Sequence, residues 1–104
     1  MNISELSDYI ESNFPFDKES YPLLKNKNEA EIKAFAIQHL ALHFSKTAGK
    51  ISTVIEAHDH GSEIDLDSLK TDSVKSLVST LRLLKILDVP EEEVVDTIRK
   101  MYGD

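Results

Sequence analysis

Polar side chains recur at helical spacing in two segments of the chain, and both sets have the chemistry to bind a ligand. In the first segment, two histidines and two lysines follow one another at i, i+4, i+7 and i+11. A helix turns by about 100° per residue, so all four fall within an arc of about 60°. Ammonium and guanidinium groups bind phosphate-bearing anions. We expect the two sets to face each other across a cleft, whose candidate binding residues are His39, His43, Lys46, Lys50, Asp72, Lys75 and Arg82.

The histidines also raise the question of a metal site. A pair at i, i+4 matches two metal ligands on one helix face, but a transition-metal site needs at least a third ligand. His58 and His60 lie about 25 Å further along the same helix, too far to supply it within one chain. The acidic residues between 59 and 67 lack the spacing of a calcium loop. We therefore expect no metal and no cofactor. The alternative for the cations is that they cover apolar surface and point to water.

Composition excludes several classes of protein. The chain has 104 residues, with 19 acidic and 12 basic side chains and a net charge of −7, so nucleic acid and anionic membranes should repel it. It has no cysteine, which excludes thiolate catalysis and disulfide bonds. No apolar run approaches the roughly 18 residues of a membrane span, and the N-terminus lacks a signal-peptide pattern. We expect a single-domain cytoplasmic protein that binds neither nucleic acid nor membrane.

Hydrophobic spacing is helical nearly throughout, which predicts an all-α fold, an antiparallel bundle of about four helices. We expect helices at about 1–13, 29–58, 68–87 and 90–102. The connector at 14–28 is apolar enough to lie on the bundle. Four residues are expected to begin or end these helices by capping or backbone conformation: Ser4, Asn28, Gly61 and Pro90.

Apolar residues predict which helix faces are buried. The long helix should bury its main stripe, and the last two helices should bury one stripe each. Because residues 32–55 are apolar nearly all round, we expect a second copy to cover part of the long helix, giving a homodimer or a larger oligomer. The expected core comprises Ile37, Leu40, Ala41, Phe44, Ala48, Ile51 and Ile55, then Val74, Leu77, Val78, Leu81 and Leu84, then Val94, Val95, Ile98 and Met101.

The order of these features resembles the MazG-like all-α nucleoside triphosphate pyrophosphohydrolases. Residues 43–52, 55–61, 72–77 and 80–89 carry the resemblance, which covers about half of the chain. In that family a long helix carries Glu-Glu-x-x-Glu with a Gly before the last Glu, as Gly49 stands here, and a later helix carries Glu-x-x-Asp. The family's carboxylates hold Mg²⁺ ions that bind the triphosphate and activate a water. Its chains form dimers or tetramers.

Most of these carboxylates are replaced in this sequence. Lys46 and Thr47 stand where the family has its Glu pair, and Lys50 replaces the third Glu. Lys75 replaces the Asp, and only Asp72 keeps an acid at its position. Ammonium groups within about 5 Å of a divalent cation cost several kcal/mol. The resemblance therefore implies the family fold without its Mg²⁺ site. We expect a non-catalytic protein that acts by oligomeric interaction or by binding a nucleotide or another phosphate-bearing anion.

Two alternatives stay open. The first is a divergent nucleoside triphosphate pyrophosphohydrolase that uses His39, His43 and Asp72 as metal ligands or as general acid and base. The second is a purely structural or protein-partner module, whose apolar surface serves only association.

Overall fold

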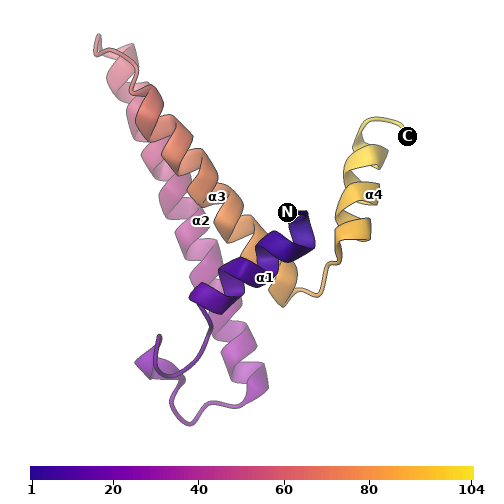
Figure 1. Ribbon diagram of the computed structural model, residues 1–104. Coiled ribbons are helices and arrows are strands. Elements are labelled where there is room, and N and C mark those ends of the chain that lie inside the picture. Colours follow the sequence, from indigo (N-terminus) through magenta and orange to yellow (C-terminus); the bar gives the residue numbers. More distant parts are fainter.

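Every regular element of the computed structural model, which describes residues 1–104, is helical (Figure 1). The all-α prediction is confirmed, and each of the four α-helices begins and ends within two residues of its expected bounds. The connector contains one short 3-10 helix, η1. The elements are α1 (Ile3–Asn13), η1 (Pro22–Leu24), α2 (Glu29–Asp59), α3 (Leu66–Ile86) and α4 (Glu91–Met101).

The first two α-helices begin with reciprocal side-chain caps. The Asn28 side chain accepts a hydrogen bond from the Glu31 backbone N–H at 2.8 Å, and the Glu31 carboxylate accepts from the Asn28 N–H at 3.2 Å. This confirms the expected cap. At α1 the same arrangement joins Asn2 and Glu5, so the expected Ser4 cap is wrong. Asn2 serves because its amide oxygen is free to accept, and the Glu three residues later returns the bond.

α2 and α3 form a long antiparallel hairpin with a tight turn at its tip (Figure 1). Gly61 has φ of 100°, the left-handed conformation expected for it. Asp65 then caps α3 by accepting from the Ser68 N–H at 3.0 Å and from its hydroxyl at 2.7 Å. These two bonds lower the pKa of the Asp65 carboxyl. The turn therefore sets where α3 begins and brings it back along α2.

The helices of this hairpin meet through small and polar side chains. Leu40 is the only large side chain in the chain that is fully buried. The Thr47 hydroxyl donates to the His43 carbonyl at 3.0 Å, which satisfies it inside the contact. Small side chains let two helices approach closely. We call this set the α2/α3 contact; its buried members are Ala36, Leu40, Thr47, Asp72 and Ser79.

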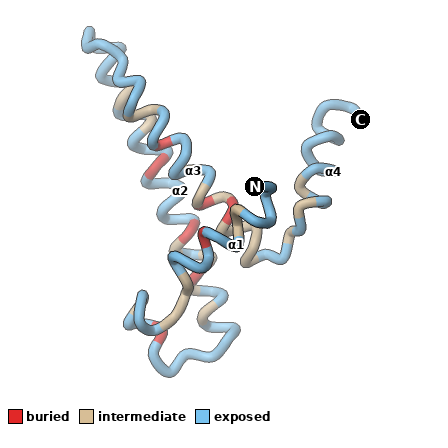
Figure 2. Tube along the Cα trace, in the orientation of Figure 1, coloured by how far each residue is buried: buried red, intermediate tan, exposed pale blue.

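The buried face of α2 is adjacent to the face that the sequence predicts. The buried residues Ala36 and Thr47 each come one position before an expected core residue. Leu40 is buried as predicted, but Phe44 is 46% exposed and Ile55 is 40% exposed. On α3, Val74 and Leu77 are 61% and 50% exposed. Only eight of 104 residues are buried, and Figure 2 shows them at a few points along the hairpin, in α1 and in the connector. The expected stripes are therefore largely open in a single chain, because the neighbouring small residues make the contact instead.

α1 packs on α3 near the base of the hairpin. Ile10 and Leu81 are buried there. Lys85 forms an ion pair with Asp8 and approaches Glu11 at 4.0 Å. The hydrogen bond that the Lys85 ammonium donates to the Asp8 carboxylate is the main reason that the pKa of Lys85 is raised. One apolar contact and one charge cluster thus hold α1 in place.

α4 stands away from the hairpin (Figure 1). None of its residues is buried, so the expected burial of Val94, Val95, Ile98 and Met101 is wrong for a single chain. The linker before it contains Asp88 at φ of 56° and directs the chain outward. A hydrogen bond of 2.9 Å from the Ile3 N–H to the Glu91 carboxylate ties the start of α4 to α1.

Candidate functional site

Six of the seven candidate residues lie on one side of the α2/α3 hairpin, and the seventh, Asp72, is buried. Phe16 of the connector marks this side, because its ring centroid lies 6.2 Å from the His39 ring on α2 and 4.5 Å from the Arg82 guanidinium carbon on α3. Seven residues make about two helical turns and return to nearly the same phase. Moving seven residues along each antiparallel helix toward the tip therefore places Lys46 and Lys75 on this side as well.

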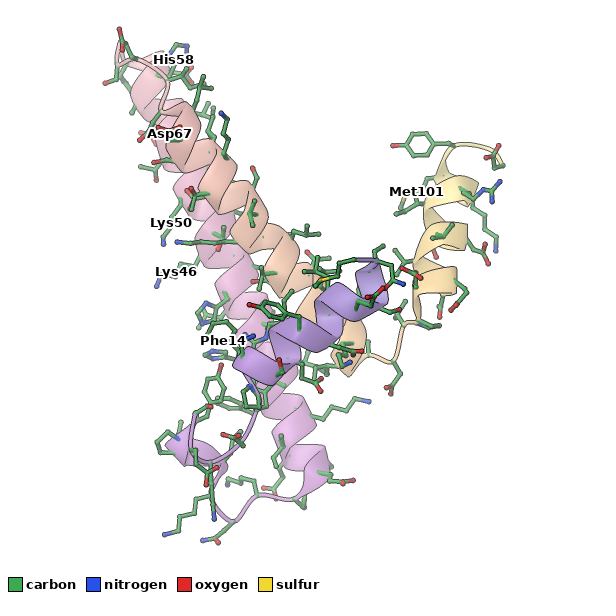
Figure 3. The ribbon with its side chains drawn as sticks, viewed as in Figure 1. Phe14, Lys46, Lys50, His58, Asp67 and Met101 are labelled. Atoms are coloured by element: carbon green, nitrogen blue, oxygen red, sulfur yellow. The ribbon has the colours of Figure 1, made fainter.

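The lysines of this side are open to solvent. Lys46, Lys50 and Lys75 are all exposed, and Figure 3 shows Lys46 and Lys50 extending from the same side of α2. The ion pairs of the chain use other cations, Lys27, Lys85 and Arg99. None of the three ammonium groups therefore forms an ion pair with a carboxylate of the chain. We call these residues, together with the exposed His43, the basic face.

Asp72 differs from the lysines in its position. It is 7% exposed and belongs to the α2/α3 contact. Its carboxylate forms no ion pair within 4.0 Å. The structure thus places Asp72 beneath the basic face, inside the hairpin, and leaves the lysines as the groups that a ligand reaches first.

His39 lies in an aromatic cluster that the sequence did not reveal. Its ring centroid is 4.9 Å from that of Tyr21, 5.4 Å from that of Phe35 and 4.4 Å from that of His43. Burial lowers the pKa of His39, and the positive charges of His43 and Arg82 lower it further. The apolar connector was expected to lie on the bundle, and its aromatic residues do so by covering this histidine.

Arg82 is also occupied by the connector. Its guanidinium donates to the Phe14 carbonyl at 2.8 Å and lies over the Phe16 ring at 4.5 Å. Such contacts combine a charge-assisted hydrogen bond with a cation–π interaction. Of the seven candidate residues, His39 and Arg82 therefore hold the connector, Asp72 lies inside the hairpin, and His43 with the three lysines stays open.

A groove lies elsewhere, between α1, the end of α3 and the start of α4. Its volume is about 550 Å³, and its charged lining residues are Lys85 and the acids Asp8, Glu11, Asp88 and Glu91. None of the candidate residues lines it. Nowhere in the chain do three His, Asp or Glu side chains come together in a way that suits a metal ion.

Comparison of the chain with protein-family models, with curated proteins and with solved structures gives no match. None of its helices combines the length and the apolar character needed to cross a membrane. The residues and geometry of the chain itself therefore carry what is inferred of its function.

Proposed function

We propose that this chain is a non-catalytic, MazG-like helical protein that self-associates and binds a phosphate-bearing anion, such as a nucleotide, on its basic face. The observation that carries the proposal is the presence of Lys46, Lys50 and Lys75 on one open side of the hairpin without carboxylate partners. Ammonium groups bind phosphate oxygens directly through charge-assisted hydrogen bonds. In this arrangement the lysines neutralise the phosphate charge, as the Mg²⁺ ions do in the hydrolases.

The surroundings of these lysines support binding over hydrolysis. Where the MazG-like enzymes have two glutamates in sequence, this chain has Lys46, which is exposed, and Thr47, which is buried inside the hairpin. The Thr47 hydroxyl is already bonded to a backbone carbonyl. Asp72 is the one acid at a matching position, and a single carboxylate is too few for a divalent cation, which takes several oxygen ligands.

Self-association is supported by the surface area of the chain. A compact monomer of 11.7 kDa exposes about 5,900 Å², whereas this chain exposes 7749 Å². Its radius of gyration of 16.5 Å also exceeds the roughly 13 Å of a compact domain of this length. A stable interface covers about 800 Å² on each partner. The excess area is thus more than enough for a second copy.

Isothermal titration calorimetry with ATP and with inorganic tripolyphosphate tests the anion site. We expect both to bind the wild-type chain, and the double variant Lys46→Glu/Lys50→Glu to lose at least about tenfold in affinity because two attractive charges become repulsive. Lys70→Glu is the matched control, because this exposed lysine of α3 lies five residues before Lys75 and so points about 140° away from it. Absence of binding by the wild type, or an equal loss in the control, would overturn the proposal.

The same preparations test the two alternatives. Release of pyrophosphate from a nucleoside triphosphate in the presence of Mg²⁺ or Mn²⁺, abolished by His43→Ala, would identify a divergent hydrolase instead. A chain that self-associates but binds neither ATP nor tripolyphosphate would be a structural or protein-partner module.

A further inference from the structure

α2 carries a second line of residues at coiled-coil spacing, and four of its six members are exposed. Positions 37, 41, 44, 48, 51 and 55 are separated by alternating steps of four and three residues. The line includes residues that directly follow Ala36, Leu40 and Thr47 of the α2/α3 contact, so it points about 100° away from that contact. We call this line the apolar stripe; its residues are Ile37, Ala41, Phe44, Ala48, Ile51 and Ile55.

The apolar stripe is complementary to itself when read in the opposite direction. A two-fold axis that passes the apolar stripe midway between positions 44 and 48 pairs position 44 with 48, position 41 with 51 and position 37 with 55. The two inner pairs place an alanine opposite Phe44 and an alanine opposite Ile51. A large side chain therefore meets a small one in each central layer, which allows two helices to interdigitate. Two-fold symmetry repeats each pair on the other half of the interface.

Charged residues extend this complementarity at both ends. Lys33 lies four residues before the apolar stripe and Asp59 lies four residues after it, and both are exposed. The same axis pairs Lys33 of one copy with Asp59 of the other. A parallel pairing would place Lys33 against Lys33 and Phe44 against Phe44. The flanking positions Ser45 and Ser52 carry no charge that opposes either arrangement, so the stripe and its ends favour the antiparallel one.

We propose that α2 pairs with α2 of a second copy in antiparallel orientation. The two-fold axis passes midway between positions 44 and 48, and the two apolar stripes form the core of the dimer. This inference rests on the self-association proposed above and adds its face, direction and register. The exposed area in excess of a compact monomer is sufficient for such an interface. The basic face lies on the other side of the hairpin and stays accessible in the dimer.

Distances between spin labels test the direction of the pairing. The chain has no cysteine, so Ser45→Cys and Glu56→Cys each introduce a single labelling position. In the antiparallel dimer the labels at position 45 lie near the axis, within about 20 Å of each other, because paired helices are 8–10 Å apart. The labels at position 56 are separated by about 30 Å along the helix axis. Short distances at both positions would overturn the antiparallel pairing.

Exchange of two side chains tests the register. Phe44→Ala leaves two alanines opposed, and Ala48→Phe brings two phenylalanines together, so each single variant should raise the dimer dissociation constant at least about tenfold. The double variant Phe44→Ala/Ala48→Phe restores a large-to-small pair and should regain most of the affinity. Sedimentation equilibrium measures the dissociation constants, and circular dichroism verifies that the variants stay helical.

The outcomes separate the two proposals. Additive losses in the double variant would overturn the register, as would single variants that dimerise like the wild type. A wild-type chain that sediments as a monomer at micromolar concentration would overturn self-association itself. A dimer with the wrong label distances would leave self-association in place and overturn only the α2 pairing.

Discussion

The two long sides of the α2/α3 hairpin differ in chemistry. On α2, each side is defined by the residues next to the packed positions, those before them on one side and those after them on the other. On one side, residues that precede the packed positions are cationic, as His39 and Lys46 show before Leu40 and Thr47. On the other side, residues that follow them are apolar, as Ala41 and Ala48 show. Because the α2/α3 contact is narrow and built from small side chains, it leaves both sides free. One helical hairpin therefore has room for both the proposed anion-binding surface and the proposed dimerisation surface.

The distribution of charge sharpens this contrast. The net charge of −7 comes from acids concentrated in the N-terminal third, in residues 56–72 and at the start of α4. The basic face carries three open lysines within this acidic chain. A local positive surface on a negative protein favours a small anion over a long polyanion, which the rest of the chain repels.

The largest expected effect on stability comes from the contact that separates the two sides. Leu40→Ala should lower the free energy of unfolding by about 2–5 kcal/mol, because Leu40 is 1% exposed and its loss leaves a cavity. Leu42→Ala, two residues away and 65% exposed, should change it by less than about 0.5 kcal/mol. Chemical denaturation at one protein concentration measures both. Equal losses would show that the packed face of α2 has been assigned wrongly.

A charge on the apolar side should break dimerisation without affecting the basic side. Phe44→Asp should raise the dimer dissociation constant at least about 30-fold, the effect of losing a central interface residue. Leu42→Asp is the matched control on the same helix, because Leu42 is exposed but lies outside the apolar stripe. Sedimentation equilibrium compares the two variants, and calorimetry with tripolyphosphate should give the wild-type affinity for each chain. Dissociation by Leu42→Asp alone would place the interface elsewhere.

A smaller effect on the free energy of unfolding is expected from pH, through His39 next to the basic face. Burial and the charges of His43 and Arg82 lower the pKa of His39, so below about pH 6.5 the unfolded chain binds a proton more readily than the folded chain. The free energy of unfolding should therefore fall as the pH drops from 6.5 toward the pKa of His39 in the folded chain.

Nuclear magnetic resonance titration of the histidine rings, combined with denaturation at each pH, checks this prediction. In His39→Gln the fall between pH 6.5 and 5 should become shallower. A His39 that titrates above pH 6.5 would contradict the prediction.

The smallest effect concerns α1, which lies outside both surfaces. Lys85→Met removes the ion pair with Asp8 and the approach to Glu11, and both acids are largely exposed. Exposed pairs contribute less than about 1 kcal/mol, so global unfolding should change little. Hydrogen exchange of the α1 amides should become faster, while exchange in α2 stays the same. Unchanged exchange in α1 would show that Ile10 and Leu81 hold the helix without the charges.

Much of the candidate site was predictable because helical spacing fixes which residues share a face. The spacing of His39, His43, Lys46 and Lys50 placed them together on α2, and the open lysines lie as that phase requires. The capture of His39 and Arg82 by the connector was not predictable. Residues 14–21 have no helical period, so no phase relates Phe16 to its partners far along the chain.

By itself, the sequence determined where α2 begins and ends, because Asn28 and Gly61 act through bonds and backbone angles within a few residues. It also determined that α2 has more apolar surface than one neighbour can cover. Only the tertiary structure decided which line of α2 meets α3. The lines through Leu40 and through Phe44 have the same spacing and adjacent phases, so periodicity cannot rank them. The choice depends on how closely α3 approaches, and the small residues around Thr47 and Ser79 permit the closest approach.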